Sequence, residues 1–274
     1  MISILYGGNS GAFDGMMISL ISLVKHTKEP IDVYILTMDL TDKNPAFAPI
    51  CEDQRAFLDK ICKEENGESS VTLIDVGDLY RERLFSSPNA ETSYTPYTLL
   101  RLLACEIPSL PKKILYLDTD TVINKDISEL WNTDVDDYEF AASLDYYGKI
   151  FMGYKYVNAG VLLLNLDMIR KTGLFDRAID LLNKKKIFLP DQTALNRLVK
   201  KKLVLDTKYN EQKHFKDDTV IQHFAKTIIW FPYFHTRNIK PWNVEGVKSL
   251  TDKYNDVLEI YQIKKQDFEK EIIK

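Results

Sequence analysis

The chain has 274 residues, 45% of them hydrophobic and 28% charged, which is enough to bury a large core in one globular domain. Its 40 acidic and 36 basic residues give a net charge of -4, which argues against nucleic acid as a partner. The three cysteines, Cys51, Cys62 and Cys105, have no metal-type spacing, and their odd number argues against a disulfide framework. We expect a cytoplasmic protein without a transmembrane segment, because neither a secretory leader nor about 20 consecutive apolar residues occurs.

Short apolar runs alternate with helical patterns along the first half of the chain. We predict strands over 2–7, 31–40, 70–76 and 114–118, and helices over 15–27, 54–66 and 95–107. Repeated strand, helix, strand order is typical of parallel strands joined by crossover helices. The predicted fold class is therefore α/β, a doubly wound sheet whose ligands lie beyond the carboxyl ends of the strands.

The second half predicts three more strands, over 139–145, 156–165 and 219–225. Helices are expected over 169–186 and 192–201. Residues 247–274 are rich in Lys, Glu and Ile and predict one or two surface helices. One continuous domain is favoured, because the sequence has no internal repeat and no low-complexity linker.

Two carboxylates stand where the strand over 114–118 should end. Side chains two apart in a strand point the same way, so Asp118 and Asp120 should lie about 6 to 7 Å apart on one side. Two such anions repel each other unless a cation lies between them, and a divalent cation shared with a substrate phosphate would resolve the conflict. The alternative is that both acids solvate a turn, with Asp120 or Asn124 capping the next element of the chain.

The stretch DTDTV also resembles the nucleophile motif of haloacid-dehalogenase-type phosphatases, in which Asp118 would be phosphorylated. In that family the motif usually opens the first strand, and a later strand ends in a second acidic pair. Here several βα units come first, and Asp217 and Asp218 precede a predicted strand. Both features count against this alternative.

Six motifs occur in one order along the chain: YTLLRLL, ILYLDTDTV, YVNAGVLLLNL, LPDQTALN, VIQHF and KPW. Over about residues 1–242, this set resembles family 8 glycosyltransferases, the group of glycogenin and the bacterial lipopolysaccharide galactosyl- and glucosyltransferases. The resemblance implies a GT-A fold, which is a Rossmann-like mixed, mainly parallel sheet flanked by helices. It also implies Mn2+, or Mg2+ in its place, and retaining transfer of glucose or galactose from a UDP-sugar to a saccharide or glycolipid. Residues 243–274 would then form a helical extension packed on or beside that domain.

The resemblance assigns the metal ion to Asp118, Asp120 and His223 and brings Thr119 to the donor. The family usually reads His-x-x-Gly-x-x-Lys-Pro-Trp, whereas the segment from His223 to Lys240 is longer here and lacks the glycine. His235 is therefore a rival metal ligand, although His223 is preferred because it follows a predicted strand. The inserted segment is expected to loop out with its four aromatic residues, Trp230, Phe231, Tyr233 and Phe234.

The resemblance places the nucleobase at the turn after the first strand, with four candidate residues: Tyr6, Gly7, Gly8 and Asn9. Glycines let the backbone approach a base, and a side-chain amide can hydrogen-bond uracil or ribose. The family commonly has a stacking aromatic shortly afterwards. Ala12 occupies the simplest match, with Phe13 as a substitute.

The donor sugar is expected to contact Arg101, Asn158, Ala159 and Asp191, with Gln192 at its reacting face. A local hydrogen bond for Asn158 and helix capping for Asp191 remain the alternatives. Lys240 should meet the diphosphate and offset its growing charge, so Asp191, Gln192 and Lys240 are the catalytic candidates. Gln192 is a poor nucleophile, which favours front-face attack with the leaving phosphate accepting the proton.

The acceptor is the least defined part. Asp145, Tyr146 and Tyr147 could line its pocket, because aromatic faces suit sugar rings. Self-glucosylation on one of the 15 tyrosines stays open. The C-terminal helix could serve packing or homo-oligomerisation, and a lipid-linked acceptor would allow peripheral membrane contact. A non-catalytic UDP-sugar-binding protein is a further alternative, because the segment from His223 to Lys240 departs from the family.

Overall fold

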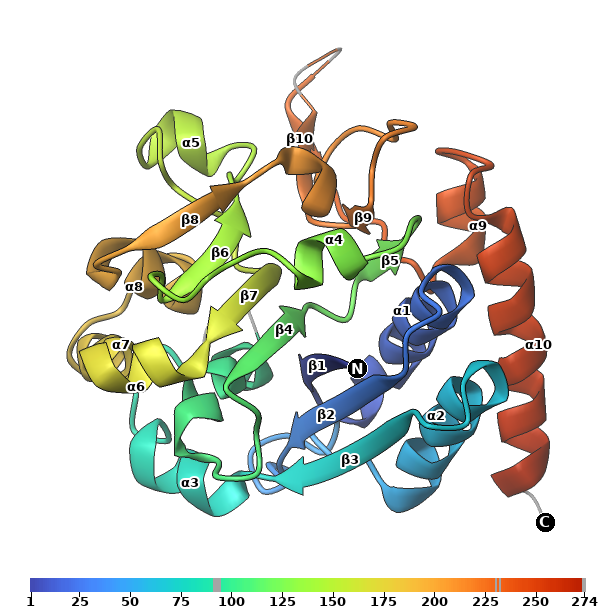
Figure 1. Ribbon diagram of the computed structural model, residues 1–274, viewed down its shortest axis with the longest axis horizontal. Coiled ribbons are helices and arrows are strands. Elements are labelled where there is room, and N and C mark those ends of the chain that lie inside the picture. The colour runs from blue at the N-terminus through green and yellow to red at the C-terminus, as the bar shows by residue number, and fades with distance from the viewer. Residues whose placement is uncertain (91–94, 230, 232, 273–274) are drawn as a thin grey trace.

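A seven-stranded sheet forms the centre of the computed structural model, which describes residues 1–90, 95–229, 231 and 233–272 (Figure 1). The strand order is β3-β2-β1-β4-β7-β6-β8. The strands are β1 (Ile2–Gly7), β2 (Ile31–Thr37), β3 (Ser70–Asp75), β4 (Lys113–Leu117), β6 (Phe140–Ser143), β7 (Val161–Asn165) and β8 (Lys202–Leu205). Only β7 runs antiparallel to its neighbours β4 and β6, while the other pairs of this sheet are parallel. The predicted α/β class with a mixed, mainly parallel sheet is confirmed.

Helices cover both faces of this sheet, which is why its central strands are mostly apolar and buried (Figure 1). One face carries α1 (Phe13–His26), α2 (Glu52–Glu65) and α10 (Asn255–Ile272). The opposite face carries α3 (Gly77–Arg83), the 3-10 helix η2 (Pro96–Glu106), α6 (Leu166–Thr172), α7 (Leu174–Lys184) and α8 (Pro190–Leu198). Alternate residues of β1 enter the two cores: Ile4 packs in the first and Leu5 in the second.

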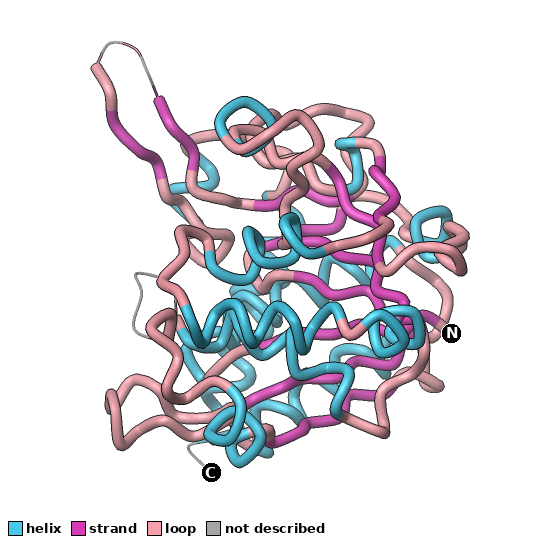
Figure 2. Tube along the Cα trace, turned by 90° about the vertical axis from the view of Figure 1, so that its left-hand side faces the viewer, coloured by secondary structure: helices cyan, strands magenta, loops and turns pink. Residues whose placement is uncertain are grey.

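Shorter elements lie beyond the carboxyl edge and around the periphery of the sheet. They are η1 (Ser10–Ala12), β5 (Thr121–Ile123), α4 (Ser128–Trp131), α5 (Gly148–Phe151), η3 (Thr207–Tyr209), β9 (Ile221–His223), β10 (Thr227–Ile229), β11 (His235–Arg237) and α9 (Val244–Lys248). Strand β5 pairs antiparallel with β9, and β10 with β11. The two strands of the β10–β11 pair stand out from the body of the molecule (Figure 2).

Several element predictions were wrong in their bounds. The single helix predicted over 169–186 is two helices, because Gly173 adopts a left-handed φ of 64° that ends α6. The strand predicted over 156–165 begins only at Val161, and the strand predicted over 219–225 is the short β9 outside the main sheet. The helix predicted over 95–107 winds as a 3-10 helix. The predicted elements do not include α3, β8, the β10–β11 pair or the short elements β5, α4 and α5.

The C-terminal helix α10 contributes to the core instead of lying free on the surface. Its buried side chains pack against α1 and α2, and the Phe268 ring lies 4.6 Å from Phe13 and 5.0 Å from Phe57, centroid to centroid. Ion pairs border this contact, for example Lys265 with Asp14 at 2.8 Å. The helix thereby closes the apolar face of α1 and α2. No helix in the described part of the chain is both long and apolar enough to cross a bilayer.

We expect Phe268→Ala to lower the free energy of unfolding by about 3 kcal/mol, because it removes a ring packed between two others. Urea denaturation followed by fluorescence measures the change. The control is Ile263→Ala on the same helix, where the side chain is 60% exposed and the effect should stay within about 0.5 kcal/mol. Equal stabilities of the two variants would show that α10 adds nothing to this core.

Candidate functional site

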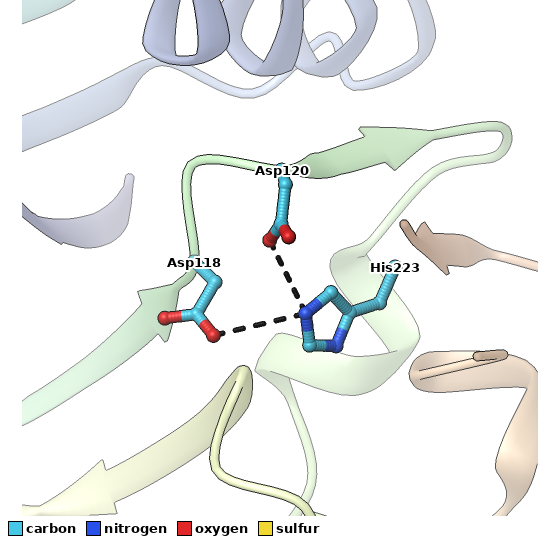
Figure 3. Close-up of side chains that lie close together, drawn as sticks. All are labelled: Asp118, Asp120 and His223. Atoms are coloured by element: carbon cyan, nitrogen blue, oxygen red, sulfur yellow. Dashed lines mark ion pairs between the residues drawn. The ribbon is translucent and has the colours of Figure 1, made fainter. Parts of the chain in front are cut away.

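The two acids of the DTD motif lie in a turn between β4 and β5. Asp118 follows the last residue of β4, and Asp120 precedes the first residue of β5. Thr121 closes the turn, donating through its hydroxyl to the Asp118 carbonyl at 2.8 Å. The prediction that both acids project from the end of one strand is therefore wrong, because β4 ends before Asp118 and β5 begins after Asp120. The turn lets a ligand atom of each acid and one of His223 gather within 4.8 Å of one another (Figure 3).

His223 reaches the acids because β9 pairs with β5, which sets His223 opposite Thr121. Its Nε2 lies 3.2 Å from Asp120 Oδ1 and 3.7 Å from Asp118 Oδ2. On the other side of the ring, Nδ1 lies 3.1 Å from the Asn210 Oδ1. A proton on Nδ1 donated to Asn210 would leave the Nε2 lone pair facing the carboxylates, as a metal ligand requires.

A lysine completes the charge balance of this group. The Lys240 ammonium lies 2.5 Å from Asp120 Oδ2 and donates to the Phe224 carbonyl at 3.0 Å. Although burial works in the opposite direction, His223 and Lys240 hold the pKa of the Asp120 carboxyl far below its usual range. Burial likewise opposes a charge on His223, yet the Asp120 carboxylate raises its pKa. Two carboxylates and an imidazole nitrogen are a donor set that could hold a divalent cation such as Mn2+.

The close approach of these side chains depends on Gly160, directly before β7. Its carbonyl accepts from the Asp118 amide at 2.7 Å. A Cβ at this position would lie 2.2 Å from His223 Cε1 and 2.9 Å from Asp118 Oδ2. Gly15 likewise leaves room for the turn between β4 and β5, since a Cβ there would lie 2.5 Å from the Thr119 carbonyl oxygen. Neither glycine was among the predicted site residues, although Gly160 belongs to the motif YVNAGVLLLNL.

Arg101 is buried beside Asp118 and connects it to Asp191. Its guanidinium donates to Asp118 Oδ1 at 2.8 Å, pairs with Asp191 Oδ2 at 3.2 Å and bonds the Ala159 carbonyl. The guanidinium lies 4.0 Å from the Tyr116 ring, whose hydroxyl also donates to Asp118 Oδ1. Burial opposes its charge, but the Asp118 carboxylate raises the pKa of Arg101. The arginine therefore fixes Asp118 and Asp191 relative to each other.

Asp191 and Gln192 lie in the first turn of α8. The residue at the N-cap is Leu189, which has a positive φ of 50°, so Asp191 is not the capping residue. Burial raises the pKa of Asp191, and the charge of Arg101 opposes that rise. Gln192 accepts from the Ala159 amide at 3.0 Å and donates to Asp145 Oδ2 at 3.1 Å.

Asn158 and Asp145 continue this polar network. The Asn158 side-chain amide donates to Asp145 Oδ2 at 2.8 Å, while its oxygen accepts from the Gly160 amide at 2.8 Å and from Asn210 at 3.0 Å. Local hydrogen bonds, one of the two expectations for Asn158, are thus present. Of the two tyrosines after Asp145, Tyr146 accepts from Lys213 at 3.1 Å and Tyr147 bonds the backbone of Ile228.

In the turn after β1, the two glycines are closely packed, and the Asn9 side chain is bonded within the protein. A Cβ at Gly8 would lie 2.8 Å from both Ala12 and Met16, and one at Gly7 would lie 3.3 Å from the Tyr97 carbonyl oxygen. The Asn9 side-chain amide donates to the Ala46 carbonyl at 2.8 Å.

Two aromatic candidates at this turn are closed to a ligand. The Tyr6 side chain is completely buried, and its hydroxyl bonds Ser19 at 2.8 Å, so it cannot touch a base. Phe13 is buried against Phe268, so the prediction that it replaces the stacking aromatic at Ala12 is wrong.

The rival histidine lies apart from the acids. His235 belongs to β11, and its Nδ1 lies 3.0 Å from the Tyr233 carbonyl oxygen. Of the inserted aromatic residues, Phe231, Tyr233 and Phe234 are exposed, as expected of a segment that loops out, and Trp230 lies outside the described residues. The structure therefore brings His223, and not His235, to Asp118 and Asp120.

Comparisons with known proteins identify related glycosyltransferases. A lipopolysaccharide glucosyltransferase of Escherichia coli, WaaO, is 29% identical over 265 residues, covering 88% of this chain and 73% of that protein. A putative glycosyltransferase of Haemophilus influenzae is 25% identical over 210 residues, covering 69% of this chain. The chain spans about half the length of that relative, 56%. The crystal structure of galactosyltransferase LgtC with donor and acceptor sugar analogues superposes with a TM-score of 0.68 at 20% identity, covering 93% of this chain and 100% of LgtC.

The likeness to LgtC identifies the sheet and its flanking helices as the predicted GT-A fold. The model of the family described as glycosyl transferase family 8 matches residues 3–246, nearly the whole chain. The chain belongs to glycosyl transferase family 8.

Proposed function

We propose that the protein is a metal-dependent, retaining hexosyltransferase that moves glucose or galactose from a UDP-sugar to a saccharide or glycolipid acceptor. The observation that carries the proposal is the convergence of Asp118, Asp120 and His223 within 4.8 Å of one another, with Lys240 against Asp120. Family membership supports the reaction type, and a relative named as a lipopolysaccharide glucosyltransferase supports the acceptor class.

The residues present fit a divalent cation. Asp118, Asp120 and His223 would hold it, with Asn210 orienting the imidazole and Gly160 leaving the necessary room. When bound, Mn2+ or Mg2+ supplies positive charge that stabilises a leaving diphosphate. Lys240 adds a second cation at the same place, where it would stabilise charge that grows on the diphosphate as the sugar bond breaks.

The buried network would hold the donor sugar. Arg101 fixes Asp191 beside Asp118, and Gln192 is fixed through Ala159 and Asp145, so the positions of these side chains are set before substrate binds. We assign Asp191 and Asn158 to the sugar hydroxyls and Gln192 to its reacting face. An amide is a poor nucleophile, so we favour front-face attack in which the leaving phosphate accepts the proton of the acceptor.

The nucleobase is assigned to the backbone turn from Gly7 to Asn9. The glycines allow backbone to approach a flat ring, and the Asn9 oxygen can accept from uracil or ribose. Because the Tyr6 and Phe13 side chains are buried, base recognition in this proposal relies on the backbone and Asn9.

A phosphatase mechanism at Asp118 finds less support. Asp118 Oδ1 already accepts from both Arg101 and Tyr116. The later acidic residue Asp217 is almost fully exposed and pairs with Lys253 on the surface. A non-catalytic UDP-sugar-binding protein differs from the proposed enzyme only in turnover, which donor hydrolysis measures.

We expect Mn2+-dependent release of the hexose from UDP-glucose or UDP-galactose, with UDP-N-acetylglucosamine as the third donor in the panel. Mass spectrometry measures hydrolysis with Mn2+ and with chelator. Chelation should lower turnover about 100-fold or more, because it removes the cation that stabilises the leaving diphosphate. His223→Ala should lose the metal response while the matched variant His235→Ala keeps it. Hydrolysis unaffected by chelator would end the metal proposal, and tight donor binding without turnover would favour the binding protein.

Lys240→Ala should lower kcat about 100-fold with little change in the donor KM, because the cation acts mainly on charge that develops in the transition state. Lys248→Ala, on the neighbouring helix α9 and away from the acids, serves as the charge-matched control and should be neutral. A Lys240→Ala variant that raises KM alone would show that this lysine serves only ground-state binding.

Gly160→Ala should weaken Mn2+ binding at least 10-fold in calorimetric titration, because its Cβ would displace His223 or Asp118. Gly67→Ala is the control, since a Cβ there meets nothing within 4 Å. Thermal melting of both variants checks that the fold is retained. Unchanged affinity in a folded Gly160→Ala protein would mean that the three ligands do not bind together.

A further inference from the structure

Large apolar side chains are exposed on two neighbouring segments beyond the carboxyl edge of the sheet. The first segment, residues 148–155, contains α5 and exposes Ile150, Phe151, Met152 and Tyr154. The second segment, residues 227–237, contains β10 and β11 and exposes Phe231, Tyr233 and Phe234. We call these seven side chains the apolar rim. Exposure reaches 76% at Tyr154 and 87% at Phe231, which is unusual for aromatic residues of a globular domain.

The two segments are joined to each other. Tyr147, the residue before α5, donates its hydroxyl to the Ile228 carbonyl of β10 at 2.9 Å and accepts from the Ile228 amide at 2.9 Å. Figure 1 shows α5 and β10 at the same end of the molecule, and Figure 2 shows the β10–β11 pair rising beyond the body. The rim is therefore one surface at one end of the protein.

The two chain segments that form the rim carry charged residues of one sign. Residues 146–156 and 225–240 contain no Asp or Glu, although the whole chain has a net charge of -4. Within these ranges, the cations beside the rim are Lys149, Lys155, Lys226 and Arg237, while Lys240 pairs with Asp120 at the candidate site. Two of them lie over aromatic rings, Lys149 5.3 Å from the Tyr146 centroid and Lys155 5.5 Å from the Tyr154 centroid. Aromatic side chains mixed with Lys and Arg suit the interface of an anionic lipid bilayer.

We infer that the apolar rim docks the protein on the surface of an anionic phospholipid membrane. Aromatic and aliphatic tips would enter the headgroup region, while the four cations would meet lipid phosphates. A protein partner fits less well, because the cores of protein interfaces are depleted in Lys. By contrast, α10 mixes both signs of charge along its length and offers no comparable surface.

The rim is directly connected to the candidate site. Asp145, two residues before Tyr147, has its carboxylate bonded by Asn158 and Gln192. Docking through the rim would bring the sugar of a membrane-anchored glycolipid to that site, and this step alone rests on the proposed function. Membrane docking would then supply acceptor at high local concentration.

The test is flotation of the full chain with lipid vesicles, without donor or metal. We expect the protein to float with vesicles of phosphatidylglycerol and phosphatidylcholine but not with phosphatidylcholine alone. Phe231→Ser combined with Phe151→Ser should lower the bound fraction at least 5-fold. Ile263→Ser, at an apolar position on α10 that is about as exposed as Phe151, should not change it. Lys149→Glu combined with Lys226→Glu should abolish the preference for anionic vesicles even if the aromatic variant is unstable.

Several outcomes would overturn the inference. Failure to float with anionic vesicles, or flotation that no rim variant weakens, rules out docking through this surface. A dimer that dissociates only in the Phe231→Ser and Phe151→Ser variant, detected by light scattering, would assign the rim to a second copy instead. Metal-dependent hydrolysis of UDP-sugar in solution, which uses none of these residues, tests the proposed function separately and should persist in every rim variant.

Discussion

The structure of the site depends on how its buried and partly buried carboxylates are neutralised. Asp118 and Asp191 share the guanidinium of Arg101, and Asp120 is held by His223 and Lys240. A carboxylate left buried without such a partner would cost several kcal/mol, so each pair fixes the segments that carry it. These pairs join η2, the β4–β5 turn, α8, β9 and the segment before α9 at one edge of the sheet. The same charges that hold the edge together would bind a cation and a diphosphate.

Close backbone approach is the second requirement, because paired charges help only at short distance. Gly160 and Gly15 lie where a side chain would push His223, Asp118 or the Thr119 carbonyl away. The apolar strands beneath them are buried on both faces and have little freedom to shift. Ligand geometry is therefore set by the packing of the sheet and not by the flexible reach of the side chains.

Much of this could be predicted from sequence, because apolar strands that end in polar residues indicate both the sheet and its functional edge. The fold class and the placement of most elements could be inferred from such local patterns, whereas the approach of His223 to Asp118 and Asp120 was implied by the resemblance to family 8 glycosyltransferases. Non-local packing decided the rest. Tyr6 and Phe13 are buried because Ser19 of α1 and Phe268 of α10 pack against them, and no local pattern in the sequence indicates these contacts. Likewise, the site forms only because β5, directly after the turn that carries the acids, pairs with β9, a strand about 100 positions away.

The long segment between His223 and Lys240 shows how the site accommodates a long connection between two of its residues. Antiparallel pairing of β10 with β11 sets Thr227 opposite Arg237, so the chain leaves and returns at nearly the same place. Lys240 therefore still reaches Asp120 and the Phe224 carbonyl, as a shorter segment would allow. The entropic cost of a longer loop grows only slowly with its length, and here the inserted residues pair with each other. Because the ends of the segment stay in place, its exposed aromatic side chains can serve a separate contact without displacing Lys240.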